Sequence, residues 1–114
     1  FCTFLGHIKN PDDFYPTIDV LIKPTRESNP WGRDILEAMM YGIPVISVGS
    51  YSKFVNNKTG HLMDVFDAKQ CAIYINQIMK NKSKHRALGR NAKKIVESLC
   101  SSKVCKKQFE KFWL

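Results

Sequence analysis

The chain has 114 residues, 44% of them hydrophobic, which suits one globular domain and is too short for two. It contains no run of about 18 apolar residues, which excludes a membrane-spanning helix in these residues, and we expect no secretory leader. The formal net charge of +8 would attract anionic partners such as nucleic acid or lipid headgroups.

Short apolar runs predict a strand-rich first half. Four of these runs have the composition of short strands: residues 1–6, 19–23, 44–48 and 59–63. Residues 11–15 carry a proline and two acids, as the first turn of a helix does. Residues 32–41 have a helical composition, and Gly42 is a natural residue to follow the end of that helix.

From residue 67 onward, apolar residues recur at three- and four-residue spacing, which predicts amphipathic helices. We expect a helix over residues 68–79, a second whose apolar stripe covers 88–99 with Ser83 as its N-cap, and a third over 102–113. Strands that alternate with helices predict an α/β fold: a doubly wound, Rossmann-like parallel sheet with a helical C-terminus.

Residues 24–46 are the most informative segment. They indicate the end of a strand, an irregular loop, the start of a helix and a second strand. Such a crossover places free backbone N–H groups at the carboxyl edge of a parallel sheet, where open α/β sheets bind nucleotides and phosphates. Because the carboxylate of Glu37 follows one turn later, we expect an anionic, sugar-bearing ligand.

Positive charge is concentrated near the C-terminus. Residues 80–114 contain eleven Lys or Arg and two Glu, a net charge of +9, whereas residues 1–79 carry −1. The simplest interpretation is a solvated helix face, and the next is salt-sensitive contact with an anionic membrane through residues 80–111. A nucleic-acid-binding domain remains a rival, but the region lacks interleaved aromatic residues before Phe109 and contains no nucleic-acid-binding motif, so we expect no nucleic-acid partner.

The cysteines show no metal or disulfide spacing. They are Cys2, Cys71, Cys100 and Cys105, and the three histidines are equally scattered. We therefore expect no metal site, no disulfide framework and a reducing, cytoplasmic location, with the basic region peripheral to the inner face of a membrane. The chain starts at Phe1 within an apolar run, so we expect it to be a piece of a longer protein.

Six short motifs occur in one order along almost the whole chain. They are 4–8 (F-x-G-x-V-like), 19–25 (D-V-x-V-x-P-S-like), 32–39 (G-x-x-x-x-E-A-M), 42–46 (G-x-P-V-I), 59–62 (T-G-x-L) and 88–92 (L-G-x-N-A). In this order they resemble the C-terminal, nucleotide-sugar-binding half of the retaining GT-B glycosyltransferases of the glycosyl transferases group 1 type.

The resemblance implies a nucleotide-diphosphate-sugar donor. Glu37 matches the second glutamate of the family's Glu–seven residues–Glu motif, which hydrogen-bonds the ribose hydroxyls; the alternative is an exposed helix glutamate. Gly32 matches the glycine that lets the backbone approach the sugar and phosphates. The N–H groups of Arg33, Asp34 and Ile35 would then point at the diphosphate.

The chain departs from the family where the first motif glutamate, which contacts the transferred sugar, is expected. Asn29 lies eight positions before Glu37, and the nearest acid, Glu27, lies ten before. Either Asn29 takes a hydrogen-bonding role in catalysis, which we favour, or Glu27 reaches in from an altered loop. Trp31 either covers the sugar or simply packs, and Arg33 either pairs with a phosphate or lies on the surface.

Two upstream residues match positions that contact the nucleobase in relatives. They are Ile8 and Asn10, and simple packing at a strand end is the alternative for Ile8. The family's phosphate-binding Arg and Lys, its catalytic histidine and its acceptor site would lie before Phe1. The acceptor would be a glycan or a lipid-linked glycan, and no metal or cofactor is implied.

Residues 1–114 are therefore expected to form a single partial domain that is inactive alone. In the usual strand order 3-2-1-4-5-6, two missing strands would separate residues 1–6 from residues 19–23. The isolated piece would then pair its strands abnormally, leave its N-terminus loose or form a dimer. A non-catalytic nucleotide- or sugar-binding module, or a regulatory subunit, is the rival to an enzyme.

Overall fold

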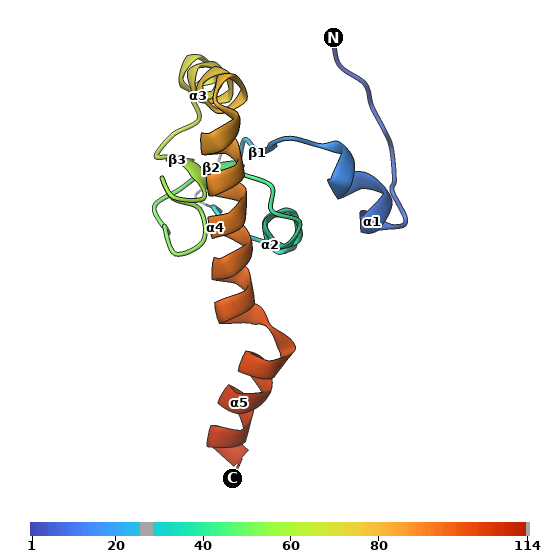
Figure 1. The fold of residues 1–114 in the computed structure, drawn as a ribbon, viewed down its shortest axis with the longest axis vertical. Helices are drawn as coiled ribbons and strands as arrows, with labels where there is room; N and C mark the ends of the chain where they lie inside the picture. The colour runs from blue at the N-terminus through green and yellow to red at the C-terminus, as the bar shows by residue number, and fades with distance from the viewer. Residues whose placement is uncertain (26–28, 114) are drawn as a thin grey trace.

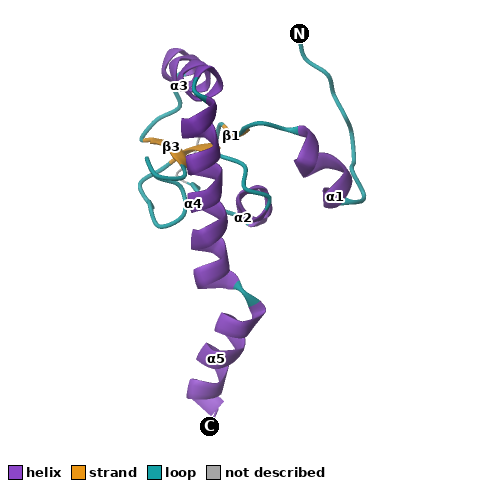
Figure 2. Cartoon of the chain, in the orientation of Figure 1, coloured by secondary structure: helices purple, strands orange, loops and turns teal. Residues whose placement is uncertain are grey.

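Three short parallel strands form the sheet in the computed structural model, which describes residues 1–25 and 29–113. The strands are β1 (Leu21–Lys23), β2 (Val45–Val48) and β3 (Gly60–Met63). The helices are α1 (Pro11–Phe14), the short 3₁₀ turn η1 (Tyr15–Thr17), α2 (Arg33–Met40), α3 (Ala68–Lys80), α4 (Lys82–Cys100) and α5 (Ser102–Trp113) (Figure 1). Figure 2 shows the small sheet lying among helices that make up most of the ordered structure.

The strand order is β1-β2-β3, and both pairings are parallel. Leu21 pairs with Val45, and Val45 in turn pairs with Gly60, so the three strands start in register. The central strand β2 is buried at all four positions, whereas β1 at the edge leaves Ile22 exposed. The predicted strand over residues 19–23 is therefore shorter than expected, since only Leu21–Lys23 form β1, and its edge position leaves it partly exposed.

Helices cover both faces of this sheet, as in a doubly wound fold. Successive residues of a strand point to opposite faces. Val45 accordingly packs in one core with Met39 of α2 and Val96 of α4, whereas Ile46 packs in a second core with Cys71 of α3. The predicted Rossmann-like α/β fold with a helical C-terminus is thus observed.

Gly42 ends α2 and brings it against α4. Its φ of +71° is the left-handed conformation that glycine adopts freely. The N–H of Gly42 donates to Met39, and the N–H of Ile43 donates to Ala38, which satisfies two carbonyls at the helix end. A Cβ on Gly89 of α4 would lie 2.0 Å from the carbonyl oxygen of Gly42, so the two helices touch through their backbones.

Two further local predictions are wrong. Residues 1–6 do not form a strand: the segment is extended and exposed, and no strand in the described residues pairs with it. Of the expected consequences of missing strands, a loose N-terminus agrees with the exposed, unpaired residues 1–6 (Figure 1), and dimer formation stays a prediction. The N-cap of α4 is Asn81 rather than Ser83, because the Asn81 side chain accepts the N–H of Lys84 at 3.0 Å.

The helix α5 extends away from the rest of the fold. Ser101 has an extended backbone (φ −64°, ψ 148°) that separates α5 from α4. No residue of α5 is buried, and in Figure 1 the helix runs away from the sheet toward the C-terminus. Its aromatic side chains are therefore in solvent within the described structure.

Candidate functional site

The N-terminus of α2 follows the carboxyl end of β1 by way of the loop after Lys23. Gly32 is its N-cap and provides no side chain to bond the first turn. The amides of Arg33, Asp34 and Ile35 have no hydrogen-bond acceptor within the described residues. The side chain of Ile35 is fully buried, so only its backbone can face a ligand. These amides and the helix dipole make this end suitable for an anion.

Glu37 lies one turn into α2 and has two side-chain partners. The Tyr15 hydroxyl donates to Oε2 at 3.0 Å, and Nε of Arg33 donates to Oε1 at 2.6 Å. The Glu37 side chain is 28% exposed. It is therefore a half-buried, hydrogen-bonded carboxylate rather than the fully exposed helix glutamate considered as its alternative.

Tyr15 is held as a donor to this carboxylate. Its hydroxyl also lies 3.3 Å from the carbonyl oxygen of Asp34, but its single proton favours the shorter bond to the charged group. Burial, then the hydrogen bond and charge of Glu37, raises the pKa of Tyr15 to about 12. The hydroxyl consequently stays protonated at neutral pH.

Glu37 borders a small cavity of about 260 Å³. Its other walls come from the N-terminal segment and the first helical turns: Gly6, His7, Ile8, Pro11, Phe14 and Tyr15. The structure thus brings the predicted residue Ile8 beside Glu37. Asn10 does not line this cavity, because its side chain caps α1 by accepting the N–H of Asp12 at 3.1 Å.

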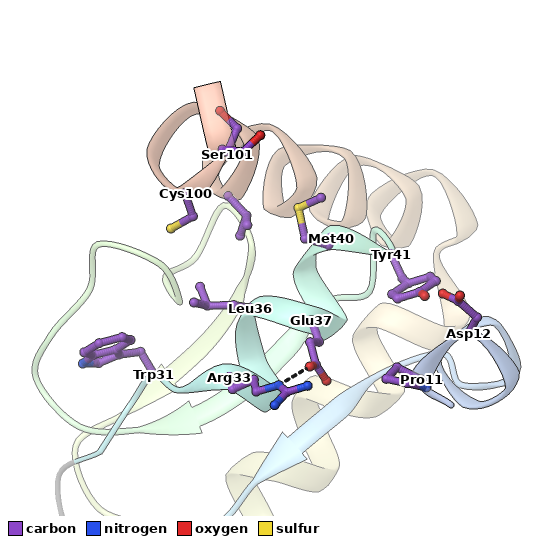
Figure 3. A pocket seen from close by; sticks show the side chains of 12 residues that line it. Pro11, Asp12, Trp31, Arg33, Leu36, Glu37, Met40, Tyr41, Cys100 and Ser101 are labelled. Atoms are coloured by element: carbon purple, nitrogen blue, oxygen red, sulfur yellow. Dashed lines mark hydrogen bonds and ion pairs between the residues drawn. The ribbon is translucent and has the colours of Figure 1, made fainter. Parts of the chain in front are cut away.

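A larger and mainly apolar pocket of about 890 Å³ also borders Glu37. Figure 3 shows Trp31 at one end, the Arg33–Glu37 pair in the middle and the junction of α4 and α5 around Cys100 above them. The Trp31 ring is 48% exposed and stacks on Phe54 at 6.0 Å between ring centroids. Trp31 therefore both packs on its neighbour and presents a free surface.

An ion pair crosses the helix start. Nζ of Lys23 lies 3.0 Å from Oδ1 of Asp34. A Cβ on Gly32 would lie 2.8 Å from that Nζ and 2.9 Å from the same Oδ1, so the missing side chain of Gly32 leaves room for the pair. The Asp34 side chain is therefore paired with Lys23, and the group of Asp34 that can bind a ligand is its backbone N–H.

The structure gathers most, though not all, of the predicted donor residues around Glu37. Asn29 is exposed, and Glu27, its alternative, lies outside the described residues. Sequence reasoning missed Tyr15 and Lys23, which are distant in sequence from the groups they contact. Within residues 1–25 and 29–113, no three His, Cys, Asp or Glu side chains lie close enough together to hold a metal ion.

Comparison with known proteins identifies the family. Residues 2–95 match the model of Glycosyl transferases group 1. The capsular polysaccharide biosynthesis glycosyltransferase CapM of Staphylococcus aureus is 28% identical over 112 residues, which are 96% of this chain and 29% of CapM. The chain therefore spans about three-tenths of the length of this curated relative.

Solved structures show the same fold. HepE of Anabaena, in complex with UDP and glucose, superimposes with a TM-score of 0.85 at 23% identity, over 97% of this chain and 31% of HepE. Sucrose-phosphate synthase of Thermosynechococcus elongatus gives a TM-score of 0.75 at 27% identity, over 88% and 26% of the two chains. Together with the match to the family model over most of its length, the Rossmann-like sheet shows that the chain belongs to the glycosyl transferases group 1 family.

Proposed function

We propose that the protein containing this chain transfers a sugar from a nucleotide-diphosphate donor to an acceptor, with retention at the anomeric carbon. Residues 1–114 would be part of its donor-binding domain and inactive alone. The observation that carries this proposal is the position of the Glu37 carboxylate, between a cavity and the amides at the start of α2, which have no acceptor among the described residues. HepE, which has the same fold, binds UDP and UDP-glucose.

In this proposal the nucleoside occupies the 260 Å³ cavity beside Ile8. Both ribose hydroxyls donate to Glu37, since an ionised carboxylate is an acceptor with about four lone-pair positions. The diphosphate lies at the first turn of α2, where the amides of Arg33, Asp34 and Ile35 stabilise the negative charge that grows as the glycosidic bond breaks. No metal or cofactor is required by this arrangement.

The transferred sugar would lie beyond the diphosphate, near the loop that precedes α2. Asn29 is exposed there and has the hydrogen-bonding groups to contact sugar hydroxyls without adding charge. Trp31 presents a ring surface that can cover a sugar face. Arg33, whose side chain is 89% exposed, can turn from Glu37 to the diphosphate.

The acceptor in this proposal is a glycan or lipid-linked glycan at the cytoplasmic side of a membrane. Among the described residues, no helix is both long and apolar enough to cross a bilayer. Peripheral contact would instead involve the basic region of residues 80–111. The specific observation in its favour is α5, where Phe109, Phe112 and Trp113 are 63%, 88% and 74% exposed and four lysines share the helix.

The donor role of Glu37 is tested by calorimetric titration of the full-length gene product with UDP, GDP and ADP. Glu37→Gln should weaken the binding of the highest-affinity nucleotide by about 1–3 kcal/mol, as expected for hydrogen bonds to a charged group. Glu97→Gln, on the exposed face of α4, is the matched control and should leave binding unchanged. An unchanged affinity in Glu37→Gln would refute the role.

Turnover distinguishes the enzyme from its rival, a nucleotide- or sugar-binding module without catalysis. The full-length gene product should release nucleoside diphosphate from a nucleotide sugar when an acceptor is supplied. Tight nucleotide binding with no release from any donor would favour the binding module.

A further inference from the structure

Tyr15 is fixed in place by its surroundings. Its side chain is 6% exposed, its ring stacks on Tyr41 with centroids 5.3 Å apart, and Phe14 meets it edge-on at 5.3 Å. The turn that carries it follows α1, whose first residues are capped by Asn10. Because the ring is packed on both sides, the hydroxyl has little freedom and points at Glu37.

The two partners of Glu37 differ in how firmly their side chains are held. Tyr15 bonds Oε2 from a buried position, whereas Arg33 bonds Oε1 with a side chain that is 89% exposed. An exposed ion pair of this kind contributes little and separates readily. A ligand that approaches Glu37 would therefore displace Arg33 and leave Tyr15 bound.

We propose that Tyr15 is a positioning residue that sets a preference for ribonucleotides over 2′-deoxyribonucleotides, by orienting the Glu37 carboxylate toward the cavity beside Ile8. This rests on the proposed function, in which Glu37 binds the ribose hydroxyls. One bond from Tyr15 leaves enough acceptor positions on the carboxylate for both hydroxyls. Without that bond the carboxylate rotates freely or follows Arg33, and the geometry for two simultaneous bonds is lost.

The test is the ratio of two affinities, measured by calorimetry on the full-length gene product with UDP and 2′-deoxy-UDP, or with the GDP or ADP pair if that base binds more tightly. The wild type should prefer the ribonucleotide by about tenfold or more, as one hydrogen bond to a charged group allows. Tyr15→Phe should reduce this preference to about twofold while affinity for the 2′-deoxy form changes little. Tyr41→Phe removes a hydroxyl without a described partner and should keep the preference.

Arg33→Ala provides a second variant that removes no buried group. It should weaken UDP and 2′-deoxy-UDP to the same extent, because both share the diphosphate, and should keep the ribose preference, because Tyr15 still orients Glu37. If Arg33→Ala abolishes the preference, or if Tyr15→Phe weakens both nucleotides equally, Tyr15 does not position the carboxylate. If Glu37→Gln loses the preference but Tyr15→Phe retains it, this inference fails and the proposed function stands. If Glu37→Gln retains the wild-type preference, the proposed function itself fails.

Discussion

Gly89→Ala should destabilise the fold because it places a methyl group against the backbone of Gly42, in the turn that ends α2. The new Cβ would lie 2.0 Å from the carbonyl oxygen of Gly42 and 3.0 Å from its carbonyl carbon. An ordinary contact requires about 3.4 Å or more between such atoms, so α4 must move by roughly 1.4 Å. Leu88, Ala92 and Val96, which are at most 5% exposed, would then lose packing.

The expected change in unfolding free energy follows from two opposing effects. Overpacking of this kind costs about 1–3 kcal/mol, and the obstruction is a backbone atom that cannot rotate away, which favours the upper end. Alanine in place of glycine within a helix stabilises the helix by about 1 kcal/mol. The expected net loss is about 2 kcal/mol of unfolding free energy.

Urea denaturation followed by circular dichroism measures this loss. With a slope of about 2 kcal/mol per molar urea, the midpoint should fall by about 1 M. Ser98→Ala, on the exposed face of the same helix, is the control and should change stability by less than about 0.5 kcal/mol. A Gly89→Ala midpoint equal to or above that of the wild type would contradict this prediction, because α4 could then move away from Gly42 at no cost.

Two further predictions concern Tyr15 and α5. The raised pKa of Tyr15, about 12 against 10, contributes stability that is fully present below pH 10 and is lost as the pH rises through 12. The stability difference between wild type and Tyr15→Phe should therefore shrink by up to about 3 kcal/mol between pH 9 and pH 12, and a constant difference would contradict it. Replacing Phe109, Phe112 and Trp113 by serine should reduce sedimentation with phosphatidylglycerol vesicles, an effect that neutral vesicles should not show; equal sedimentation of wild type and variant would count against membrane contact by α5.

The sequence is sufficient to predict the central part of the fold. The apolar run of β2 and the residues around Gly42 carry local signals, and each predicts its own element without knowledge of the rest of the chain. Residues 1–6 have an equally apolar composition, yet no strand forms there. A strand depends on a neighbour with free N–H and C=O groups, and composition cannot show whether that neighbour exists.

The candidate site likewise contains residues that the sequence locates and contacts that only the structure reveals. Glu37 and Gly32 belong to a motif with fixed spacing, so the sequence locates them. The bond from Tyr15 to Glu37 joins residues 22 positions apart, and the Lys23–Asp34 pair joins residues separated by 11. Neither contact follows a helical or strand period, so only the packing of η1 and β1 against α2 reveals them.

The most direct test of the donor role is a crystal structure of the full-length gene product soaked with its nucleotide-sugar donor. We expect both ribose hydroxyls within about 3.2 Å of the Glu37 carboxylate oxygens, with the diphosphate at the first turn of α2. A ribose that makes no hydrogen bond to Glu37 would contradict this expectation.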